Sequence, residues 1–583
     1  MLIALLWVIA LAVINPAGEF PVNDDWAYTK NVFQLSANNK FYVDPWPAMT
    51  LVSQTLYGTL FTKVFGFSFL VLRISTFVLA LASSIILFQI LKRKCANDYV
   101  AFLLSAGFCF GQIFCALSFT FMTDIFFLSF TVFSVYTLIL YLDHQKTKHY
   151  LLFTFFCLIA VLNRQHGLLL PLLILFPIIS KKNLSVKTLF LAAFPFITCL
   201  GGHLGYRFLL WAYSIPQNMQ GLGKLTESIK NINLQLAHIN TGDFFLTLGW
   251  MLLPCALFLL WKQREKNPKK TLLFAGILLI STCITWSALK LYPIGNISNL
   301  YGTGPKFQKD SAINIANRFN VAEWYKWTVR VISLFSVSFL IFKSVAGKNK
   351  FFEDKKLNAS FIFSICVFIL VYLIFSIAND AYFDRYVLPV ALFLLLLNAP
   401  QIHSLKFSFK IIAPFIILLV YLVTIFQVKD FMNWNRLRWK VLADMNRKGI
   451  SPHFIDGGFE YNAWFKPRKV FPPAYENKSW YWVDKDDFMI AGGNYPGYFK
   501  KEFYPYQHYI PFTTDTLYVL EKKDKTEFDL EGYNKKIRQL EDEIRKDKNW
   551  LNNTQLQAKE NKIPLDSMIR LNAIWTMENS SKK

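Results

Sequence analysis

Residues 68–94 read SFLVLRISTFVLALASSIILFQILKRK, and this stretch decides the fold class. The part up to Leu91 is mostly apolar, and its length suits a membrane crossing, since about 30 Å of hydrocarbon needs roughly 17–25 residues of α-helix. Three basic residues, Lys92, Arg93 and Lys94, follow at once. This order predicts a membrane-spanning helix whose basic end lies in the cytoplasm.

The rest of the 583-residue chain repeats this design. Hydrophobic residues make up 54% of it and the mean hydropathy is +0.32, so a soluble chain is excluded. We expect helices, because a closed barrel would show short alternating strands. The spans are predicted near residues 2–14, 68–91, 99–117, 125–142, 150–162, 168–180, 186–211, 243–261, 271–289, 327–342, 357–377, 387–399 and 411–428.

The net charge of +24 does not indicate nucleic-acid binding, because no groove-reading motif accompanies it. Much of the positive charge falls in short loops on alternate sides of successive spans, which is the positive-inside pattern. We therefore place these loops and the N-terminus in the cytoplasm. The segments predicted to lie outside are 15–67, 118–124, 163–167, 212–242, 290–326, 378–386 and 429–583.

The composition changes after Val428, and this change sets the predicted domains. Residues 1–428 form the transmembrane domain, whose first outer loop (15–67) carries two amphipathic stretches. Residues 429–583 are charged and predict a small mixed α/β extracytoplasmic domain. Within it, residues 454–459 indicate a strand that runs into a turn, and 535–562 a solvated helix. The predicted fold class is thus an all-α polytopic membrane protein, with about 13 transmembrane helices and this outer domain.

The cysteines and the usual nucleotide motifs carry no site. All eight cysteines precede residue 370, mostly inside apolar runs and without metal-ligand spacing, so we expect no disulfide framework and no cysteine metal site. No Walker loop, dinucleotide-binding glycine loop or HExxH helix is present. An enzyme that faces outward would therefore be better served by a donor carried in the membrane.

Short polar clusters fall on the predicted outer side and turn scattered charges into one candidate site. They are residues 23–26, 44–47, 123–124, 163–166, 306–310 and 384–386. Asp24 and Asp25 lie just outside the first span, where a carboxylate can accept a proton from an attacking hydroxyl. Asp124 is held at the bilayer edge, where ionisable groups tend to face a polar cavity. The alternatives are a solvated acidic loop and a helix cap.

The basic residues of these clusters suit a phosphate. Arg164 and His166 lie in a break between two weak spans, and such breaks are tolerated only where they line protein or a cavity. Arg385 follows Asp384, which would orient it, and Arg73 can reach the outer face from the second span. The alternatives are a structural histidine and interfacial anchoring by Arg385 and Tyr386.

Three motifs resemble the membrane-embedded glycosyltransferases of the GT-C fold, in the branch of the protein O-mannosyltransferases and the aminoarabinose transferase of lipid A. The acidic pair of the first outer loop matches Asp24-Asp25, the second acidic site matches Asp124, and the Asp-Arg-Tyr-x-x-Pro signature matches residues 384–389. Departures are Ala27 where some relatives have Arg, residues 44–47 where many have Lys or His beside paired prolines, and His166-Gly167 where relatives have Lys-Gly. They leave the donor sugar open.

The resemblance implies inverting transfer of a hexose or pentose from a polyprenyl-phosphate donor to an acceptor hydroxyl on the outer face of a bacterial inner membrane. Asp24 would be the general base. The implied catalytic residues are Asp24, Asp25 and Asp124, the lipid-phosphate ligands Arg164, Arg385, His166 and Arg73, and the supporting residues Tyr28, Asp384 and Tyr386. Some relatives use a divalent ion, for which Asp24, Asp25 and Asp124 are the candidate ligands here. The acceptor would be a glycolipid such as lipid A, a polysaccharide or a protein.

Two other functions fit a polytopic chain. One is an oligosaccharide ligase or polymerase, and the other is a transporter or lipid flippase. A transporter should carry ionisable residues near mid-span and broken helices in corresponding halves, whereas nearly all charges here lie near the span ends. A structural scaffold is the remaining alternative.

Overall fold

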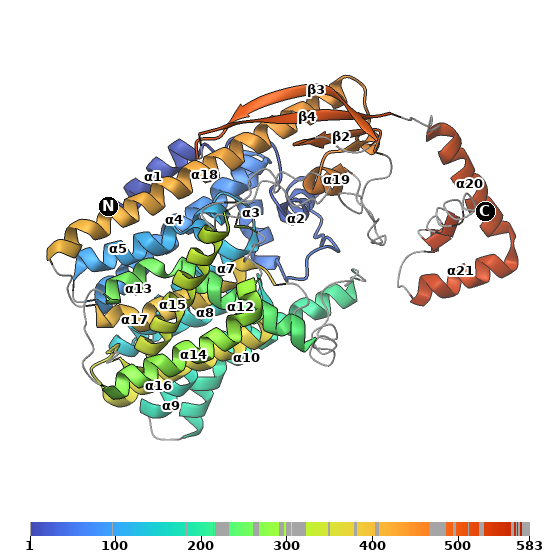
Figure 1. The fold of residues 1–583 in the computed structure, drawn as a ribbon. Coiled ribbons are helices and arrows are strands. Elements are labelled where there is room, and N and C mark those ends of the chain that lie inside the picture. The colour runs from blue at the N-terminus through green and yellow to red at the C-terminus, as the bar shows by residue number, and fades with distance from the viewer. Residues whose placement is uncertain are drawn as a thin grey trace.

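The structure is a computed structural model, and it describes residues 2–95, 97–181, 185–213, 215, 233–260, 268–290, 297–298, 305, 322–347, 350–377, 382–402, 407–465, 486–493, 497–510, 512–523, 530–560 and a few positions up to 576. The bulk of it is a bundle of apolar helices, with a small sheet at one end (Figure 1). The predicted fold class, a helical membrane protein with a small mixed α/β domain, is confirmed, while the location of that domain on the outer side stays a prediction.

A helix or a pair of helices stands at each predicted span. They are α1 (Leu2–Ile14), α4 (Phe69–Lys94), α5 (Asp98–Cys109) with α6 (Gln112–Leu117), α7 (Thr123–His144), α8 (Thr147–Val161), η1 (Gln165–Leu169) with α9 (Leu172–Lys181), α10 (Val186–Ala212), α12 (Leu234–Met251) with α13 (Leu253–Leu260), α14 (Pro268–Lys290), α15 (Glu323–Ala346), α16 (Lys355–Ile377), α17 (Val387–Asn398) and α18 (Phe407–Arg447). Seven are long and apolar enough to cross a membrane alone, or eight if the bent α12–α13 pair counts as one. The count of thirteen spans stays a prediction.

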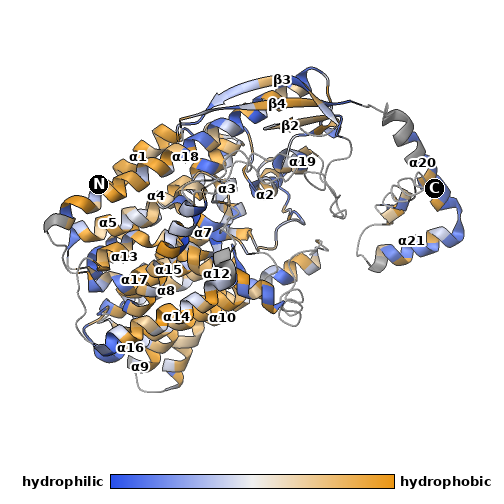
Figure 2. Ribbon diagram, in the orientation of Figure 1, coloured by the Kyte–Doolittle hydropathy of each residue, from blue (hydrophilic) through white to orange (hydrophobic). Residues whose placement is uncertain are grey.

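Burial separates a central helix from the lipid-facing ones. In α7, 83% of the apolar window is buried, against 28% in α10 and 11% in α14. Figure 2 shows that α10 and α14 are largely hydrophobic, and little of their apolar surface is buried inside the protein. This is expected for helices that are surrounded by lipid. One buried polar contact links α1 and α4: the Trp7 indole N–H donates to Ser84 Oγ at 3.0 Å.

One glycine permits a close helix crossing in the bundle. A Cβ on Gly249 would stand 2.0 Å from the carbonyl oxygen of Ser333, so α12 and α15 approach there as closely as their backbones allow. Small residues of this kind are typical of helix contacts inside membranes.

The first outer loop holds two helices, as predicted. They are α2 (Asp25–Asn38) and α3 (Val52–Phe65). The inner face of α2 is buried through Trp26, Tyr28 and Val32, while Leu56, Leu60 and Val64 of α3 are exposed. The loop therefore covers the end of the bundle, and α3 carries an apolar face outward.

The outer domain is built on the end of α18, which continues to Arg447 and so crosses the predicted domain boundary after Val428. Its four-stranded sheet has the order β1 (Ile455–Asp456), β2 (Phe488–Ala491), β4 (Thr514–Lys522), β3 (Tyr498–Gln507). β1 pairs with β2 in parallel (Ile455 opposite Phe488) and the other pairs are antiparallel. Val441, Leu442 and Met445 of α18 pack against Ile455, Ile490, Leu517 and Val519 of the sheet. One helix thus joins the membrane domain to the sheet.

Three further helices complete the outer domain. The predicted strand-to-turn at 454–459 appears as β1 followed by α19 (Phe459–Phe465). The single helix expected over 535–562 is two, α20 (Leu530–Lys546) and α21 (Lys548–Glu560), because the chain breaks at Asp547, whose carboxylate caps α21. This helix pair lies away from the bundle (Figure 1).

Candidate active site

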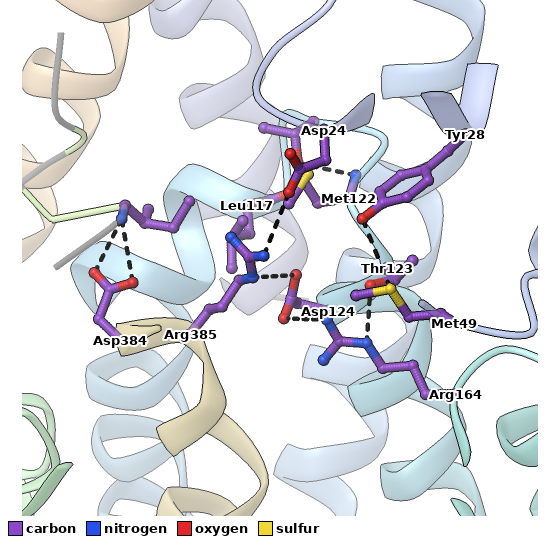
Figure 3. A network of polar contacts seen from close by, with 12 residues as sticks. Asp24, Tyr28, Met49, Leu117, Met122, Thr123, Asp124, Arg164, Asp384 and Arg385 are labelled. Carbon is purple, nitrogen blue, oxygen red and sulfur yellow. Dashed lines mark hydrogen bonds and ion pairs between the residues drawn. The ribbon is translucent and has the colours of Figure 1, made fainter. Parts of the chain in front are cut away.

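Five of the six polar clusters meet at one end of the bundle; the sixth, 306–310, lies outside the described residues. Asp24, Asp124, Arg164 and Arg385 form what we call the arginine–aspartate network, which Figure 3 shows from close by. Its members come from the first outer loop, α7, the break after α8, and η3 (Asp384–Tyr386). The structure therefore unites residues that are up to 361 positions apart.

Asp124 is the centre of the network. It lies in the first turn of α7, and its two oxygens point at two arginines: Oδ1 is 2.9 Å from Nη2 of Arg164, and Oδ2 is 3.5 Å from Nε of Arg385. All three side chains are at most 5% exposed. Buried charges of this kind persist only when they are paired, so Asp124 holds both guanidinium groups in place.

Arg164 owes its position to the break between α8 and η1. A Cβ on Gly167 would stand 2.5 Å from the backbone nitrogen of Val161, so only glycine lets the chain fold back this tightly. The break is tied to the start of α3 by hydrogen bonds from Leu51 N–H to Asn163 O and from Thr50 Oγ1 to Val161 O. Arg164 then donates from Nε to Thr123 Oγ1 at 2.8 Å, directly beside Asp124.

Arg385 spans the two aspartates. Its Nη2 lies 3.5 Å from Oδ2 of Asp24, while its Nε faces Asp124. The guanidinium is 1% exposed and packs over Phe383, yet Nη1 has no hydrogen-bond partner among the described residues. A buried donor left open in this way is costly unless a further acceptor arrives.

Asp384 takes a different role from the predicted one of orienting Arg385. Its carboxylate accepts hydrogen bonds from the backbone N–H groups of Ile297 and Ser298, at 2.7–3.1 Å, and lies on the far side of Arg385 from Asp124 (Figure 3). The cause is the 3₁₀ turn, which sends neighbouring side chains about a third of a turn apart. Asp384 therefore fixes the outer segment at 297–298 beside the site.

Aromatic rings line the network. Tyr386 lies 5.9 Å from both Arg164 and Arg385, measured from guanidinium carbon to ring centroid. His166 packs against Tyr372 of α16, with the ring centroids 5.2 Å apart. Tyr28 is buried one turn after Asp24; burial and the Asp24 charge raise its pKa well above the ordinary value, so it stays a neutral phenol.

Asp24 is the most accessible acid of the network, with a side chain 16% exposed against 2% for Asp124. Its Oδ1 accepts the indole N–H of Trp46 at 3.2 Å, and within the described part of the chain Oδ2 makes only the 3.5 Å contact with Arg385. The loop that presents Trp46 is shaped by Asp44, which accepts the Trp46 backbone N–H at 2.9 Å. Asp24 is therefore held in position but stays partly exposed.

Asp25 points away from the network. It is 1% exposed and accepts the backbone N–H groups of Val22, at 2.5 Å, and Phe121, at 3.2 Å. Burial raises the pKa of Asp25 to about 8, although Arg73 and the two backbone donors oppose this shift. Asp25 thus joins the first outer loop to the turn before α7, a structural position that its sequence neighbourhood with Asp24 does not reveal.

Arg73 also lies outside the described contacts of the network. Its guanidinium is 1% exposed, donates to the carbonyl oxygens of Pro16 and Phe20, and packs 4.1 Å over the Phe20 ring. It therefore fixes the chain between α1 and Asp24. The phosphate role predicted for Arg73 has no geometric support in these contacts.

The outer domain reaches the site through Glu460 of α19. Its Oε1 accepts the backbone N–H of Asn23 at 3.2 Å, and Oε2 pairs with Nη2 of Arg438 at 2.7 Å. Asn23 has φ 56°, a left-handed conformation that asparagine tolerates, and it directly precedes Asp24. Lys30 adds a second tie by donating to Ala463 O at 2.8 Å. We call the Arg438–Glu460–Asn23 contact the outer joint.

The sequence placed Trp46 in a polar cluster of the site without giving it a role, and it did not single out Tyr372 or Gln54. Gln54, 1% exposed, bridges Asn163 and the carbonyl of Phe121, which precedes Met122 and Asp124. The available signal was a glutamine inside an amphipathic helix, since a buried amide needs partners.

A divalent ion has few candidate ligands here. In the part of the chain that the structure describes, no three His, Cys, Asp or Glu side chains are grouped to hold a metal ion. Asp24 and Asp124, the expected pair, are bridged by Arg385, and Asp25 faces backbone donors. The described residues therefore do not fit a metal site, and the proposed reaction has no step that involves a metal ion.

A family model described as "Dolichyl-phosphate-mannose-protein mannosyltransferase" matches residues 56–206. This segment contains Asp124 and Arg164, and the match supports the resemblance to GT-C membrane glycosyltransferases predicted from the sequence. No curated protein matches the sequence as a relative.

Three solved structures are similar to this chain over most of its length. ArnT from Cupriavidus metallidurans in the apo state has 10% identity and a TM-score of 0.41, covering 88% of this chain and 97% of ArnT. The same protein bound to undecaprenyl phosphate gives 9% and 0.38, covering 89% and 96%. The oligosaccharyltransferase AglB from Archaeoglobus fulgidus, with an inhibitory peptide and a dolichol-phosphate, gives 12% and 0.39, covering 76% and 58%. At these identities and TM-scores, the solved structures do not indicate the activity of this chain.

Proposed function

We propose that this protein is an inverting glycosyltransferase that moves a sugar from a polyprenyl-phosphate donor to an acceptor hydroxyl at the outer face of the membrane. The observation that carries the proposal is the pairing of one accessible carboxylate, Asp24, with a buried arginine, Arg385, whose Nη1 lacks a partner among the described residues. A base and an anion site within one network are what such a transfer needs. The family match over residues 56–206 supports it.

Asp24 takes the proton. The acceptor O–H donates to the free side of the Asp24 carboxylate, and as its oxygen forms a bond to the anomeric carbon, the proton passes to Asp24. The Trp46 N–H on Oδ1 and Arg385 on Oδ2 fix the plane of the carboxylate. Attack opposite the leaving group inverts the anomeric centre, and Asp24 later releases the proton to water.

Arg385 and Arg164 receive the leaving group. The bond between the anomeric carbon and the phosphate oxygen breaks, its electron pair stays on that oxygen, and the lipid phosphate changes from a diester monoanion to a monoester with more negative charge. Guanidinium groups stabilise the product charge more than the substrate charge, and this difference lowers the barrier. Each such contact is worth on the order of 2.7–4 kcal/mol if oxyanion-hole donors are a guide.

Asp124 acts on the arginines rather than on the substrate. Two arginines without a counter-ion would be strongly disfavoured in a buried place, and Asp124 balances them from behind. In this proposal the phosphate binds in front, at the open Nη1 of Arg385. His166, two residues after Arg164, is proposed to border the same phosphate.

The proposed setting follows from the predicted orientation. The active site and the outer domain face the extracytoplasmic side of a bacterial inner membrane, where lipid-linked sugars are the available donors. The donor sugar, hexose or pentose, and the acceptor, a glycolipid, polysaccharide or protein, are set by the outer loops and α19.

Native mass spectrometry of the purified protein tests the proposal without a known substrate. Wild type is compared with Arg164→Ala/Arg385→Ala, and with Arg447→Ala as the control, because Arg447 is an exposed arginine of the outer part of α18. We expect polyprenyl phosphate on wild type and on the control, with or without an attached sugar, and its loss from the double variant.

Bulk phospholipid alone on all three proteins, in several detergents, would contradict the proposal. A polyprenyl phosphate retained in full by the double variant would move the phosphate site elsewhere. An attached sugar on wild type would identify the donor.

A further inference from the structure

The turn between β3 and β4 carries apolar side chains outward. Its described residues Tyr509, Ile510 and Phe512, which we call the hairpin tip, are partly or fully exposed, and Phe512 is 88% exposed. A phenylalanine this open in a small polar domain has no role in the sheet core, which is built from Leu517, Val519 and Ile490. The elements next to the hairpin tip therefore indicate what Phe512 contacts.

The hairpin tip is fixed to α18 where that helix leaves its apolar stretch. Asp430 accepts the backbone N–H groups of Tyr509, at 2.8 and 3.0 Å, and of Ile510, at 3.2 Å. The Tyr509 ring stacks on Phe426, with centroids 5.9 Å apart and planes 24° apart. Lys429 Nζ lies 4.4 Å from the Tyr509 ring centroid. These contacts hold the tip beside residues 426–430.

The exposed apolar face of α18 leads directly to this point. Ile411, Phe415, Leu418, Leu419 and Leu422 are all exposed along one side of the helix, at the spacing of three and four residues that places side chains on one face. Phe426 is the next position of this stripe, and Tyr509 covers it. The lipid-facing surface of the span is thus continued by the hairpin tip.

We propose that the hairpin tip is a lipid contact, with Phe512 inserted at the boundary between headgroups and acyl chains of the outer leaflet. Phe512 supplies the apolar group, Tyr509 an amphipathic ring of the kind enriched at this depth, and Lys429 a cation among the headgroup phosphates. The occupant of the surface is the lipid bilayer, because the tip extends a lipid-facing stripe.

The contact would set the height of the outer domain above the membrane. The sheet is attached to the bundle through α18, and the same domain carries Glu460 of the outer joint. A second attachment at the hairpin tip prevents the sheet from rocking about α18. This inference does not depend on the proposed enzymatic function.

Spin labelling tests the lipid contact. Cys283 and Cys366, the exposed cysteines among the eight, are first replaced by serine, and a label is placed at Phe512→Cys. The matched control is Phe503→Cys, since Phe503 is also strongly exposed, at 71%, but lies back along β3. Both proteins are placed in vesicles of phosphatidylethanolamine and phosphatidylglycerol, and collision rates with O₂ and with a water-soluble nickel complex are measured.

We expect the label at 512 to collide more with O₂ and less with nickel than the label at 503, because O₂ concentrates in the acyl region. Equal nickel collision at both sites would overturn the proposal, since the tip would then lie in water. A label at 512 shielded from both reagents would also overturn it, because a protein surface and not lipid would cover the tip.

Discussion

Among the described residues, two groups of buried arginines and carboxylates near Asp24 are built differently. In the outer joint, Arg438 meets Glu460 at 2.7 Å, and the other Glu460 oxygen accepts the Asn23 N–H. In the arginine–aspartate network, Arg385 reaches Asp24 and Asp124 at 3.5 Å each, and its Nη1 has no partner among the described residues. Arg438 thus makes one short, direct contact, while Arg385 makes two longer ones; among the described residues each guanidinium also has a nitrogen without a hydrogen-bond partner, Nε in Arg438 and Nη1 in Arg385.

This difference distinguishes a fixed attachment from a group held ready for a ligand. A short buried pair resists change, because separating its partners leaves buried charges unpaired. A guanidinium whose contacts are long, as those of Arg385 are, can turn toward an arriving phosphate at less cost. The two groups adjoin, since Asn23 and Asp24 are neighbours, so their effects on transfer and on stability can be compared by substitution.

Asp24→Asn should have the largest effect on transfer. Asparagine keeps the shape and the Trp46 contact but cannot take the proton, so kcat should fall by about 10²–10⁴, the usual contribution of a general base. Lipid binding should persist, because Arg164 and Arg385 remain. Transfer is followed with the donor identified by mass spectrometry, and folding by the melting curve. Near-normal transfer in this variant would show that the base is another group.

Arg385→Lys should come next. A lysine carries one compact charge and cannot span Asp24 and Asp124 together, so kcat should fall by roughly 10²–10³. The matched change in the outer joint, Arg438→Lys, keeps a single contact with Glu460 and should lower transfer far less. Measuring kcat and the melting temperature of both variants side by side checks the contrast. Equal loss of transfer in the two would remove the distinction between the groups.

Glu460→Gln should have a moderate effect. The neutral amide still offers an acceptor to Asn23 but leaves the buried Arg438 without its charge partner, so the melting temperature should fall. Transfer should fall about tenfold, the size of one lost hydrogen bond to a charged group, through a looser Asp24. The KM for the lipid donor should not change, because the arginines are intact. A raised KM at constant kcat would instead place Glu460 in donor binding.

The helices and the clusters of the site were predictable from sequence, but the partners within it were not. Apolar runs are long and local, so α4, α7 and α16 follow from length and hydropathy alone. That Asp124, Arg164 and Arg385 lie on one side of the membrane could be predicted from the rule that alternate loops share a side. Which carboxylate faces which arginine depends on the Gly167 fold-back and on the η3 turn, and neither leaves a periodic signal.

The two neighbouring acids illustrate this limit. The residues themselves do not distinguish Asp24 from Asp25, and only the family resemblance named Asp24 as the base; in the structure, the start of a helix sends consecutive side chains about 100° apart. Asp24 therefore contacts Trp46 and Arg385, whereas Asp25 accepts hydrogen bonds from the backbone of Val22 and Phe121. The roles of two adjacent carboxylates follow from what surrounds each, and only the fold supplies that.

Asp25→Asn should have the smallest effect on transfer and a specific effect on stability. The pKa of Asp25 is about 8 in the folded protein, against 3.8 ordinarily, so between these values the native state holds a proton that the unfolded chain releases. Wild-type stability should therefore decrease as the pH rises through this window, by up to about 1.4 kcal/mol per pH unit. Asparagine cannot titrate, and the decrease should become shallower in the variant, whose absolute stability is also lower because the amide meets two backbone donors. Melting temperatures across the pH range, with Asp98→Asn as an exposed control, measure the slope. If stability changes with pH to the same extent in Asp25→Asn and in wild type, Asp25 is ionised in the folded protein. Its contact with the turn before α7 would then be made by a charged carboxylate, as in the outer joint, and not by a neutral carboxyl group.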